Sequence, residues 1–424
     1  MKNIIPSVKG TREFYPLEMT IRLWLYEKIR YVSELFGYQE YDGPFLETIE
    51  LYAAKSGEEL VKEQSFVFPD RGGNLIALRP ELTPSLARMV AQRQNQLVYP
   101  LRWWSFGPFW RYENPQKGRS REFFQWNIDI IGVNTAEADA ELVAICAEFF
   151  RQINLSPDEV KILVNDRQLM DEEIARLGIS SERKQDVFRV IDRREKMEMK
   201  VWEEFVLEEG FSRNELGGLK ELIEDKSLFE RSAYLKRFFT ILEALDADEY
   251  VEYDPRIVRG LDYYTGVVFE AKDVGEENRS ILGGGHYDNL VEDVGGNPLP
   301  GVGFAMGDVV LPIVLEELVK LPEFELYPAD VLVTVFDEDL IKESFKIADE
   351  LRGSGIRTEV YPEAVKLGKQ FKYADRIGLH YVVVIGPEEL SAGEIQIKDM
   401  RSGKQNAIKR EQAAGFLKNE LALH

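Results

Sequence analysis

The sequence contains very little cysteine and histidine. Its single cysteine, Cys146, lies in a stretch of helical pattern, so no disulfide can form within the chain. This composition is typical of proteins in a reducing cytoplasm. The three histidines, His286, His380 and His424, are far apart. Because protein zinc sites are built mainly from clustered Cys and His ligands, we predict no metal held by the protein itself.

Long apolar runs are also absent. No segment approaches the roughly 18 apolar residues that a membrane-crossing helix needs. The first residues, Met1 to Pro6, lack the apolar core of a signal peptide. We therefore expect a cytoplasmic protein with no membrane partner. An apolar content of 44% over 424 residues is enough for the cores of two or three domains.

The chain is short of positive charge. It carries 53 Lys and Arg against 75 Asp and Glu, a net charge of −22. Such a chain does not attract nucleic acid by its overall charge. The imbalance is uneven, because residues 326–424 hold 14 basic and 16 acidic side chains, whereas the first 325 residues hold 39 and 59. Any contact with RNA must therefore use local basic patches.

The most informative stretch runs from Phe109 to Asp129. Two alternating runs flank a polar loop whose Asn-Pro and Lys-Gly pairs are typical of turns. The pattern predicts an antiparallel strand pair with one apolar face and one polar face. The polar face carries Arg111, Glu113, Phe123, Gln125, Asn127 and Asp129. Arginine matches phosphate oxygens and an exposed Phe can stack on a purine; the simpler alternative is a hairpin whose charges only face solvent.

A second candidate lies at a predicted strand-to-helix junction. Residues 74–79 have a strand pattern, and Thr83 followed by Pro84 predicts a helix N-cap. Glu81 and Thr83 are then well placed to hold an amine. Simple capping of the helix by Thr83 is the plainer alternative.

A third candidate is the segment from Arg256 to Glu270, which contains Arg259-Gly-Leu-Asp-Tyr263-Tyr264. A buried arginine without an anionic partner is expensive, so a ligand phosphate is one possible partner. A structural pair with Asp262 or Glu270 is the alternative. Two glycine-rich segments follow, at residues 281–290 and 301–310, where the backbone can approach a ligand closely.

These motifs, in this order, resemble those of the class II aminoacyl-tRNA synthetases in the form found in histidyl-tRNA synthetases. The hairpin is similar to motif 2. The predicted helix 17–36, with the extended stretch after it, is similar to motif 1, the dimer-forming element. The segment from Arg259 to Tyr264 matches a signature of the histidyl enzymes. Two positions depart from the family pattern: His286 stands where an arginine is usual, and Val310 replaces the motif 3 arginine that meets the ATP γ-phosphate.

The fold class implied by the resemblance is α/β. We expect a catalytic domain at residues 1–325, with a class II antiparallel sheet flanked by helices and a helical insertion at about 170–250. Residues 326–424 alternate strand and helix patterns, which predicts a βαβαβ arrangement. This tail resembles the α/β anticodon-binding domain of the same synthetases.

The activity implied by the resemblance is that of a histidine–tRNA ligase. Such an enzyme activates histidine with ATP to histidyl-adenylate and transfers the histidyl group to tRNA(His). The expected partners are histidine, ATP with Mg²⁺, tRNA(His) and a second copy of the chain in a homodimer. Two alternatives stay open: a histidine-sensing paralogue resembling the regulatory subunit of ATP phosphoribosyltransferase, and a tRNA-binding module without ligase activity.

The resemblance also assigns roles to individual residues. The catalytic pair at the α-phosphate would be Arg111 and Arg259. Histidine would be bound by Glu81, Leu82, Thr83, Arg111, Gln125, Asp129, Arg259, Tyr263 and Tyr264. ATP would be bound by Arg111, Glu113, Arg121 and Phe123. The tRNA would be bound by Gln116, Lys117, Arg119, Lys369 and Lys372. Arg121 or Mg²⁺ would compensate for the missing motif 3 arginine.

Overall fold

The computed structural model describes residues 4–53, 64–258, 263–275, 277, 279–324 and 327–422. The chain forms two compact units, one ending at Pro322 and the other beginning at Glu323. Each unit has a hydrophobic core of its own. Within the described residues, no helix is both long and apolar enough to cross a bilayer.

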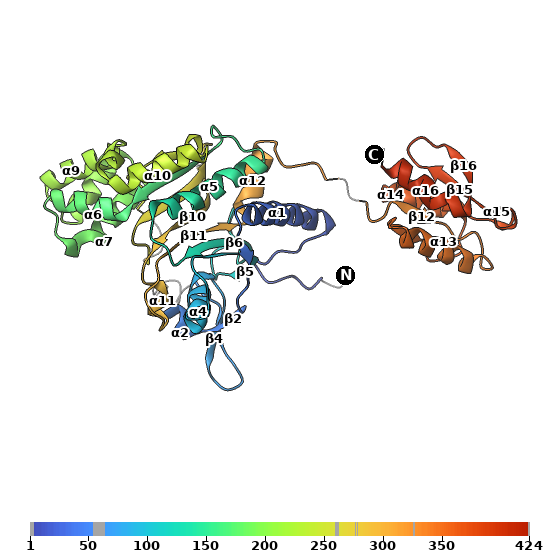
Figure 1. The fold of residues 1–424 in the computed structure, drawn as a ribbon, viewed down its shortest axis with the longest axis horizontal. Helices are drawn as coiled ribbons and strands as arrows, with labels where there is room; N and C mark the ends of the chain where they lie inside the picture. Colours follow the sequence, from blue (N-terminus) through green and yellow to red (C-terminus); the bar gives the residue numbers. More distant parts are fainter. Residues whose placement is uncertain are drawn as a thin grey trace. The chain divides into compact units, whose positions relative to one another are not determined.

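An eight-stranded sheet organises the first unit (Figure 1). Its order is β1-β5-β6-β11-β10-β9-β7-β8. The strands are β1 (Gln39–Glu40), β5 (Leu101–Trp110), β6 (Glu122–Ile131), β7 (Val160–Asp166), β8 (Val251–Tyr253), β9 (Val267–Asp273), β10 (Ser280–Tyr287) and β11 (Gly301–Gly307). From β5 to β7 every neighbouring pair is antiparallel, and β1 and β8 add parallel edges. The predicted antiparallel sheet and α/β class are confirmed.

One face of this sheet is apolar and is covered by helices. Helices α1 (Pro16–Leu35), α5 (Ala136–Gln152) and α12 (Val310–Glu317) pack on it (Figure 1). Trp126, Ile128 and Ile130, the apolar residues of β6, are fully buried there. Their period-two spacing places them on one side of the strand. The polar residues of β6 therefore point to the opposite face, as predicted.

The opposite face is only partly covered. Helices α4 (Thr83–Arg93) and α11 (Leu290–Asp293) pack there around a smaller buried cluster. A three-stranded sheet lies beside α4 in the chain, with order β2-β4-β3. Its strands are β2 (Leu46–Thr48), β3 (Val67–Pro69) and β4 (Leu75–Leu78), and the short helix α2 (Ile49–Ala53) follows β2. Strand β4 thus delivers the chain directly to the junction at Pro80.

Between β7 and β8 the chain forms a helical insertion. Its α-helices are α6 (Arg167–Arg176), α7 (Lys184–Arg193), α8 (Met199–Glu208), α9 (Arg213–Glu224) and α10 (Ala233–Ala244). Short 3-10 turns connect them, among them η2 (Arg194–Lys196). Helix α10 packs on α5, which ties the insertion to the helical layer over the sheet. The insertion begins and ends at neighbouring strands, because β7 and β8 pair side by side.

The second unit is built on a five-stranded sheet of order β13-β12-β14-β15-β16. Its strands are β12 (Val331–Val333), β13 (Thr358–Val360), β14 (Tyr381–Val384), β15 (Glu394–Asp399) and β16 (Gln405–Lys409). Its helices are α13 (Ile341–Gly353), α14 (Leu367–Arg376), α15 (Pro387–Ala392) and α16 (Arg410–Leu421). The three strands β12, β13 and β14 are parallel, in agreement with the predicted βαβαβ pattern. The pattern missed α15 and β16.

Candidate active site

The polar face of the β5–β6 hairpin forms the floor of a cavity. We call it the inner cavity, and its volume is about 280 Å³. Strand β6 contributes Gln125, Asn127 and Asp129, which are all largely buried. Strands β9, β10 and β11, the start of α4, Arg111 after β5 and the segment between β8 and β9 supply further lining residues. The alternating pattern of the sequence therefore predicted the floor of this cavity correctly.

Asp129 is the buried acid of the inner cavity. Burial raises the pKa of Asp129 to about 7, and the hydrogen bond from the Tyr287 hydroxyl, at 2.9 Å, opposes this shift. Gly303 pairs with Asp129 across the β6–β11 ladder, and a Cβ at Gly303 would overlap the carboxylate. The acid is thus fixed between a tyrosine and a glycine. A carboxyl group with this pKa can hold or release a proton near neutral pH.

The junction before α4 places Glu81 and Thr83 in the same cavity. The predicted N-cap is wrong by one residue: Leu82 is the N-cap, and no side chain caps the helix. The Thr83 side chain lies instead beside Tyr263, with which it lines the inner cavity. The Leu82 side chain is fully buried in a cluster with Phe109 and Phe123, so only its main chain is available to a ligand.

Two tyrosines form one wall of the inner cavity. The rings of Tyr263 and Tyr264 meet edge to face, with centroids 5.0 Å apart. Burial raises the pKa of both hydroxyls well above the ordinary value, so both stay protonated at neutral pH. Tyr264 lies against Gly285, where a Cβ would come within 2.9 Å of the ring. Residues 259–262 lie outside the described residues, and with them the predicted roles of Arg259.

A second hollow, the outer cavity, adjoins the inner one. Its volume is about 430 Å³, and Arg111 and Gln125 line both cavities. Arg111 Nε donates to the Pro80 carbonyl at 3.0 Å, and the guanidinium lies over the Phe123 ring at 5.3 Å. Glu113 and Phe123 also line the outer cavity. Arg111 is therefore the cation shared by the two spaces.

Of the two loop arginines, Arg121 was predicted to bind ATP and Arg119 to bind tRNA. Arg121 Nε donates to the Glu113 carbonyl at 2.9 Å, and its guanidinium lies over the Tyr112 ring at 4.2 Å. The residues lining the outer cavity include Arg119, which is 3.5 Å from the Glu113 carboxylate, but not Arg121. Arg121 thus holds the loop together, whereas Arg119 faces the space.

The remaining residues predicted to bind tRNA are dispersed. Gln116 and Arg119 pair through their backbones within the loop, and Lys117 forms an ion pair with Glu317 at 3.0 Å. Lys369 and Lys372 are exposed on α14 in the second unit. All of these side chains but Gln116 carry positive charge.

The two departures from the family pattern both have structural partners. His286 lies in β10 with Nδ1 2.9 Å from buried Asp139, whose other oxygen accepts from the Tyr234 hydroxyl of α10. Burial, the largest single influence, lowers the pKa of His286, but the hydrogen bonds to Asp139 and Asp288 and the attraction of their negative charges together outweigh it, so the net shift is upward. Val310 opens α12 and lines the outer cavity together with Gly118 of the hairpin loop. No charge replaces the arginine at that position.

Some residues of the site were not found from the sequence. Tyr287 and Glu270 line the inner cavity, together with Gly283 and Gly284 of the glycine-rich segment in which a close backbone approach was predicted. Arg79 is fully buried between the rings of Phe45 and Phe109, each 4.5 Å from its guanidinium. It precedes Pro80, the residue whose carbonyl holds Arg111. One indication of a role for Arg79 was present in the sequence, namely its position two residues before Glu81.

Comparison with known proteins agrees with this geometry. The family model described as histidyl-tRNA synthetase matches residues 10–308, and that of an anticodon binding domain matches residues 330–420. The chain is 38% identical over 443 residues to a histidine–tRNA ligase of Thermococcus kodakarensis, with 99% of each chain covered. It is 37% identical over 411 residues to the chloroplastic/mitochondrial histidine–tRNA ligase of Arabidopsis thaliana, covering 95% of this chain and 84% of that one. The crystal structure of histidyl-tRNA synthetase from Nostoc sp. PCC 7120 is similar at a TM-score of 0.82 and 26% identity, covering 99% of this chain and 100% of that one.

Three features occur together in this chain: the antiparallel sheet, an arginine shared by two cavities and a separate anticodon-binding domain. They define an aminoacyl-tRNA synthetase of the class II type. Within that class the matched model spans most of the first unit, and the relatives are similar over nearly the full length. The chain belongs to the histidyl-tRNA synthetase family, as its motifs predict.

Proposed function

We propose that the chain joins histidine to tRNA(His) at the expense of ATP. The observation that carries this proposal is the pair of cavities that meet at Arg111, one enclosing a buried acid and the other open to a charged loop. Two substrates of different size and charge can lie end to end in such a space. Their reacting groups would then meet at the shared guanidinium.

The inner cavity is proposed as the histidine site. Asp129 can accept a hydrogen bond from an imidazole N–H, and its pKa of about 7 is close to that of the ligand's own ring. Glu81, beside Thr83, is the carboxylate available to the ammonium group. A site built to pair a substrate's N–H rejects side chains without it by roughly 10⁴-fold or more.

The outer cavity is proposed as the ATP site. Phe123 offers an aromatic face and Glu113 a carboxylate for the adenine amino group. Arg119, which lines this cavity, is proposed for the outer phosphates in place of Arg121. Mg²⁺ would enter with ATP: the described residues include no group of three or more His, Cys, Asp or Glu arranged to hold a metal, so the phosphates must supply most of its ligands.

The reaction follows from positioning and charge neutralisation. A carboxylate oxygen of histidine attacks the α-phosphorus, the bond to the β-phosphate oxygen breaks, and pyrophosphate leaves. Arg111 neutralises the charge that builds on the α-phosphate oxygens. A terminal ribose hydroxyl of tRNA then attacks the acyl carbon, and AMP leaves with the bonding electrons.

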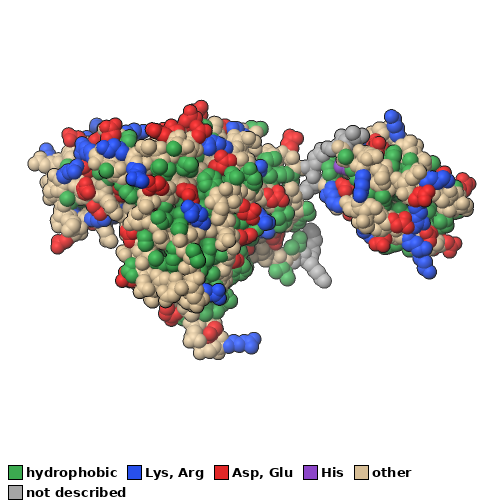
Figure 2. All heavy atoms as spheres, in the orientation of Figure 1, with side chains coloured by type: hydrophobic (Ala, Val, Ile, Leu, Met, Phe, Trp, Pro, Cys, Tyr) green, Lys and Arg blue, Asp and Glu red, His purple; other side chains and the backbone are tan. Residues whose placement is uncertain are grey.

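A homodimer and a cytoplasmic location complete the proposal. Apolar side chains remain exposed on α1, at Leu23, Tyr31 and Leu35, and also at Phe45, just before β2, and Phe68 of β3. Figure 2 shows apolar side chains reaching the surface of the first unit in patches between charged ones. Such patches are typical of surfaces covered by a partner. A second copy of the chain is the partner expected from motif 1.

Val310 favours a second candidate, the non-catalytic histidine-sensing paralogue, because this position lacks the expected arginine. The anticodon-binding domain and the arginines of the outer cavity oppose it. Histidine-dependent exchange of pyrophosphate into ATP separates the candidates. Exchange eliminates both non-catalytic alternatives, and exchange without charging of tRNA would indicate a stand-alone adenylating enzyme. A chain that binds histidine without exchange would overturn the proposed function.

A further inference from the structure

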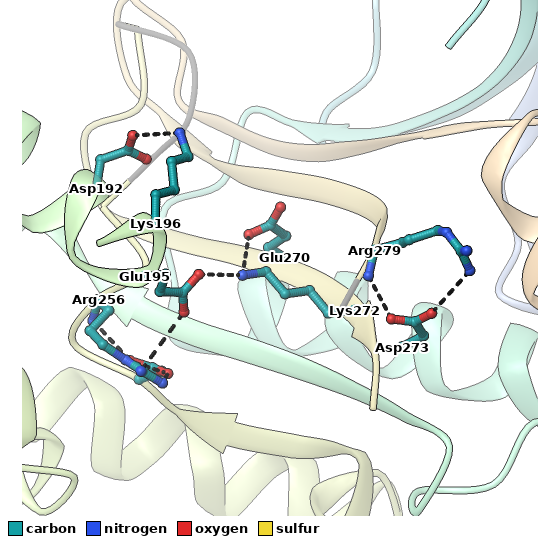
Figure 3. Close-up of polar contacts among 9 residues, drawn as sticks. Asp192, Glu195, Lys196, Arg256, Glu270, Lys272, Asp273 and Arg279 are labelled. Atoms are coloured by element: carbon teal, nitrogen blue, oxygen red, sulfur yellow. Dashed lines mark hydrogen bonds and ion pairs between the residues drawn. The ribbon is translucent and has the colours of Figure 1, made fainter. Parts of the chain in front are cut away.

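An ion-paired lysine lies at the wall of the inner cavity. Strand β9 carries Glu270 and Lys272 on one face, since side chains two residues apart point the same way. Glu270 lines the inner cavity. Lys272 is only 6% exposed, and its Nζ lies 3.5 Å from the Glu270 carboxylate (Figure 3). A lysine this deeply buried is rare unless it is paired.

The second partner of Lys272 comes from the insertion. Lys272 Nζ donates to Glu195 at 3.1 Å, and Glu195 belongs to the turn η2 between α7 and α8 (Figure 3). Glu195 also lies 3.9 Å from Arg256, which in turn donates to Asp254 at 2.9 Å. Positive and negative groups therefore alternate from the cavity wall to the insertion.

This arrangement joins three parts of the first unit that are distant in sequence. Glu195 reaches the strand that bears Glu270 through Lys272. It reaches the segment just after β8 through Arg256. Truncating one partner of a buried charge pair is costly, because the other charge is left uncompensated. A displacement of η2 would therefore change the position of Lys272 and of Glu270 at the cavity wall.

We propose that Lys272 is a positioning residue that couples the insertion to histidine activation. Its ammonium group holds the Glu270 carboxylate in place, and Glu195 holds the ammonium group. Histidine activation is then fastest when η2 is docked on β9 through the Glu195–Lys272 ion pair. This inference rests on the proposed function, because the coupling acts on the first step of that reaction.

The test uses the full-length chain and histidine-dependent pyrophosphate exchange. For Lys272→Met we expect kcat to fall about tenfold, and for Glu195→Gln about fivefold, each with the KM for histidine changed less than about twofold. The matched control is Lys196→Met. Lys196 is the next residue of η2, is 59% exposed and pairs with Asp192, so this variant should retain the wild-type rate (Figure 3).

The double variant separates coupling from independent roles. If Glu195 acts through Lys272, adding Glu195→Gln to Lys272→Met costs no further activity; independent roles would multiply to about fiftyfold. Multiplied effects, or both single variants within about twofold of wild type, would overturn the proposal. Because Lys272→Met leaves Glu270 uncompensated and can fail to fold, the decisive single variant is Glu195→Gln, at a side chain 25% exposed.

A second measurement does not depend on catalysis. Amide hydrogen exchange of β9 should speed up about threefold or more in Glu195→Gln and stay unchanged in Lys196→Met. An unchanged rate of amide hydrogen exchange in β9 of Glu195→Gln would overturn the proposed coupling. Failure of the wild-type chain to exchange pyrophosphate into ATP would instead refute the proposed function. In that case the amide hydrogen exchange of β9 would still show whether Glu195 stabilises the strand.

Discussion

The inner and outer cavities differ in how their charged groups are held. In the inner cavity Asp129 is 4% exposed and fixed by Tyr287 and by the backbone of β11. In the outer cavity the Arg119 side chain is 64% exposed and its partner Glu113 is on the same loop. Burial makes a charge selective, because an unsuitable ligand leaves it unpaired. Exposure lets a charge exchange partners cheaply. The inner cavity is therefore suited to choosing a substrate and the outer one to neutralising phosphate.

Arg111 belongs to both cavities, and its removal should produce the largest effect. Arg111→Ala is expected to lower the rate of pyrophosphate exchange by at least about 10³-fold, since it removes preorganised charge at the reacting phosphate. Arg111→Lys keeps the charge without the planar fork and should recover only part of the rate. Single-turnover formation of histidyl-adenylate measures both. A loss confined to KM would show that Arg111 only binds substrate.

Asp129→Asn tests the selectivity of the inner cavity. We expect a loss of about 10²-fold or more in kcat/KM for histidine, because the amide cannot accept from imidazole in the same way and leaves Tyr287 a poorer partner. Discrimination against amino acids without an N–H side chain should fall with it. Competition for exchange among amino acids measures this. An unchanged preference would remove Asp129 from the histidine site.

The pKa of Asp129 predicts a specific pH dependence of stability. The folded-state pKa is about 7, above the ordinary value near 3.9, so the folded chain binds more protons between these values. The contribution is therefore present at low pH, is lost as the pH rises from about 4 to about 7, and is constant above that. Asp129→Asn removes this dependence. Relative to the variant, the wild-type thermal midpoint should fall across this window; a difference independent of pH would contradict the raised pKa.

The same contrast explains which parts of the site the sequence could predict. Gln125 and Asp129 could be predicted to share a polar face because a strand with one apolar face alternates apolar and polar residues along the sequence. The Thr83 cap was wrong because the helix begins one residue earlier than predicted and the Thr83 side chain lies beside Tyr263, a residue 180 positions away. No local pattern contains such a contact.

Residues that act through tertiary contacts were missed for the same reason. Arg79 and Lys272 look like ordinary strand charges until the fold places two Phe rings or a distant glutamate beside them. In the second unit β16 was missed because its side chains are mostly exposed and carry no apolar alternation. The sheet, the hairpin and the helical insertion were predictable, and the supports of the site were not.

The two loop arginines offer a sharper test of the outer cavity. Arg119→Ala should lower kcat for exchange about tenfold and raise the KM for ATP, because Arg119 lines the space for the phosphates. Arg121→Ala should act mainly on stability, at about 1 kcal/mol, since its guanidinium bonds a carbonyl and packs on Tyr112. Initial rates at varied ATP, with thermal melts of both variants, separate the two. The opposite outcome would return the phosphate role to Arg121.

The smallest effect is expected where exposure is greatest. Lys117 and Glu317 pair at 3.0 Å with side chains 61% and 46% exposed, and an exposed pair contributes about 0–1 kcal/mol. Lys117→Ala should leave pyrophosphate exchange and the melting midpoint nearly unchanged, while raising the KM for tRNA about two- to threefold at low salt, where a phosphate can take the place of Glu317. Glu317→Gln, which frees the lysine, should lower that KM instead. Charging of tRNA should be measured for both variants at 50 mM and 200 mM salt, a range over which contacts to phosphate weaken. Equal charging rates for the two variants at both concentrations would show that Lys117 does not contact tRNA.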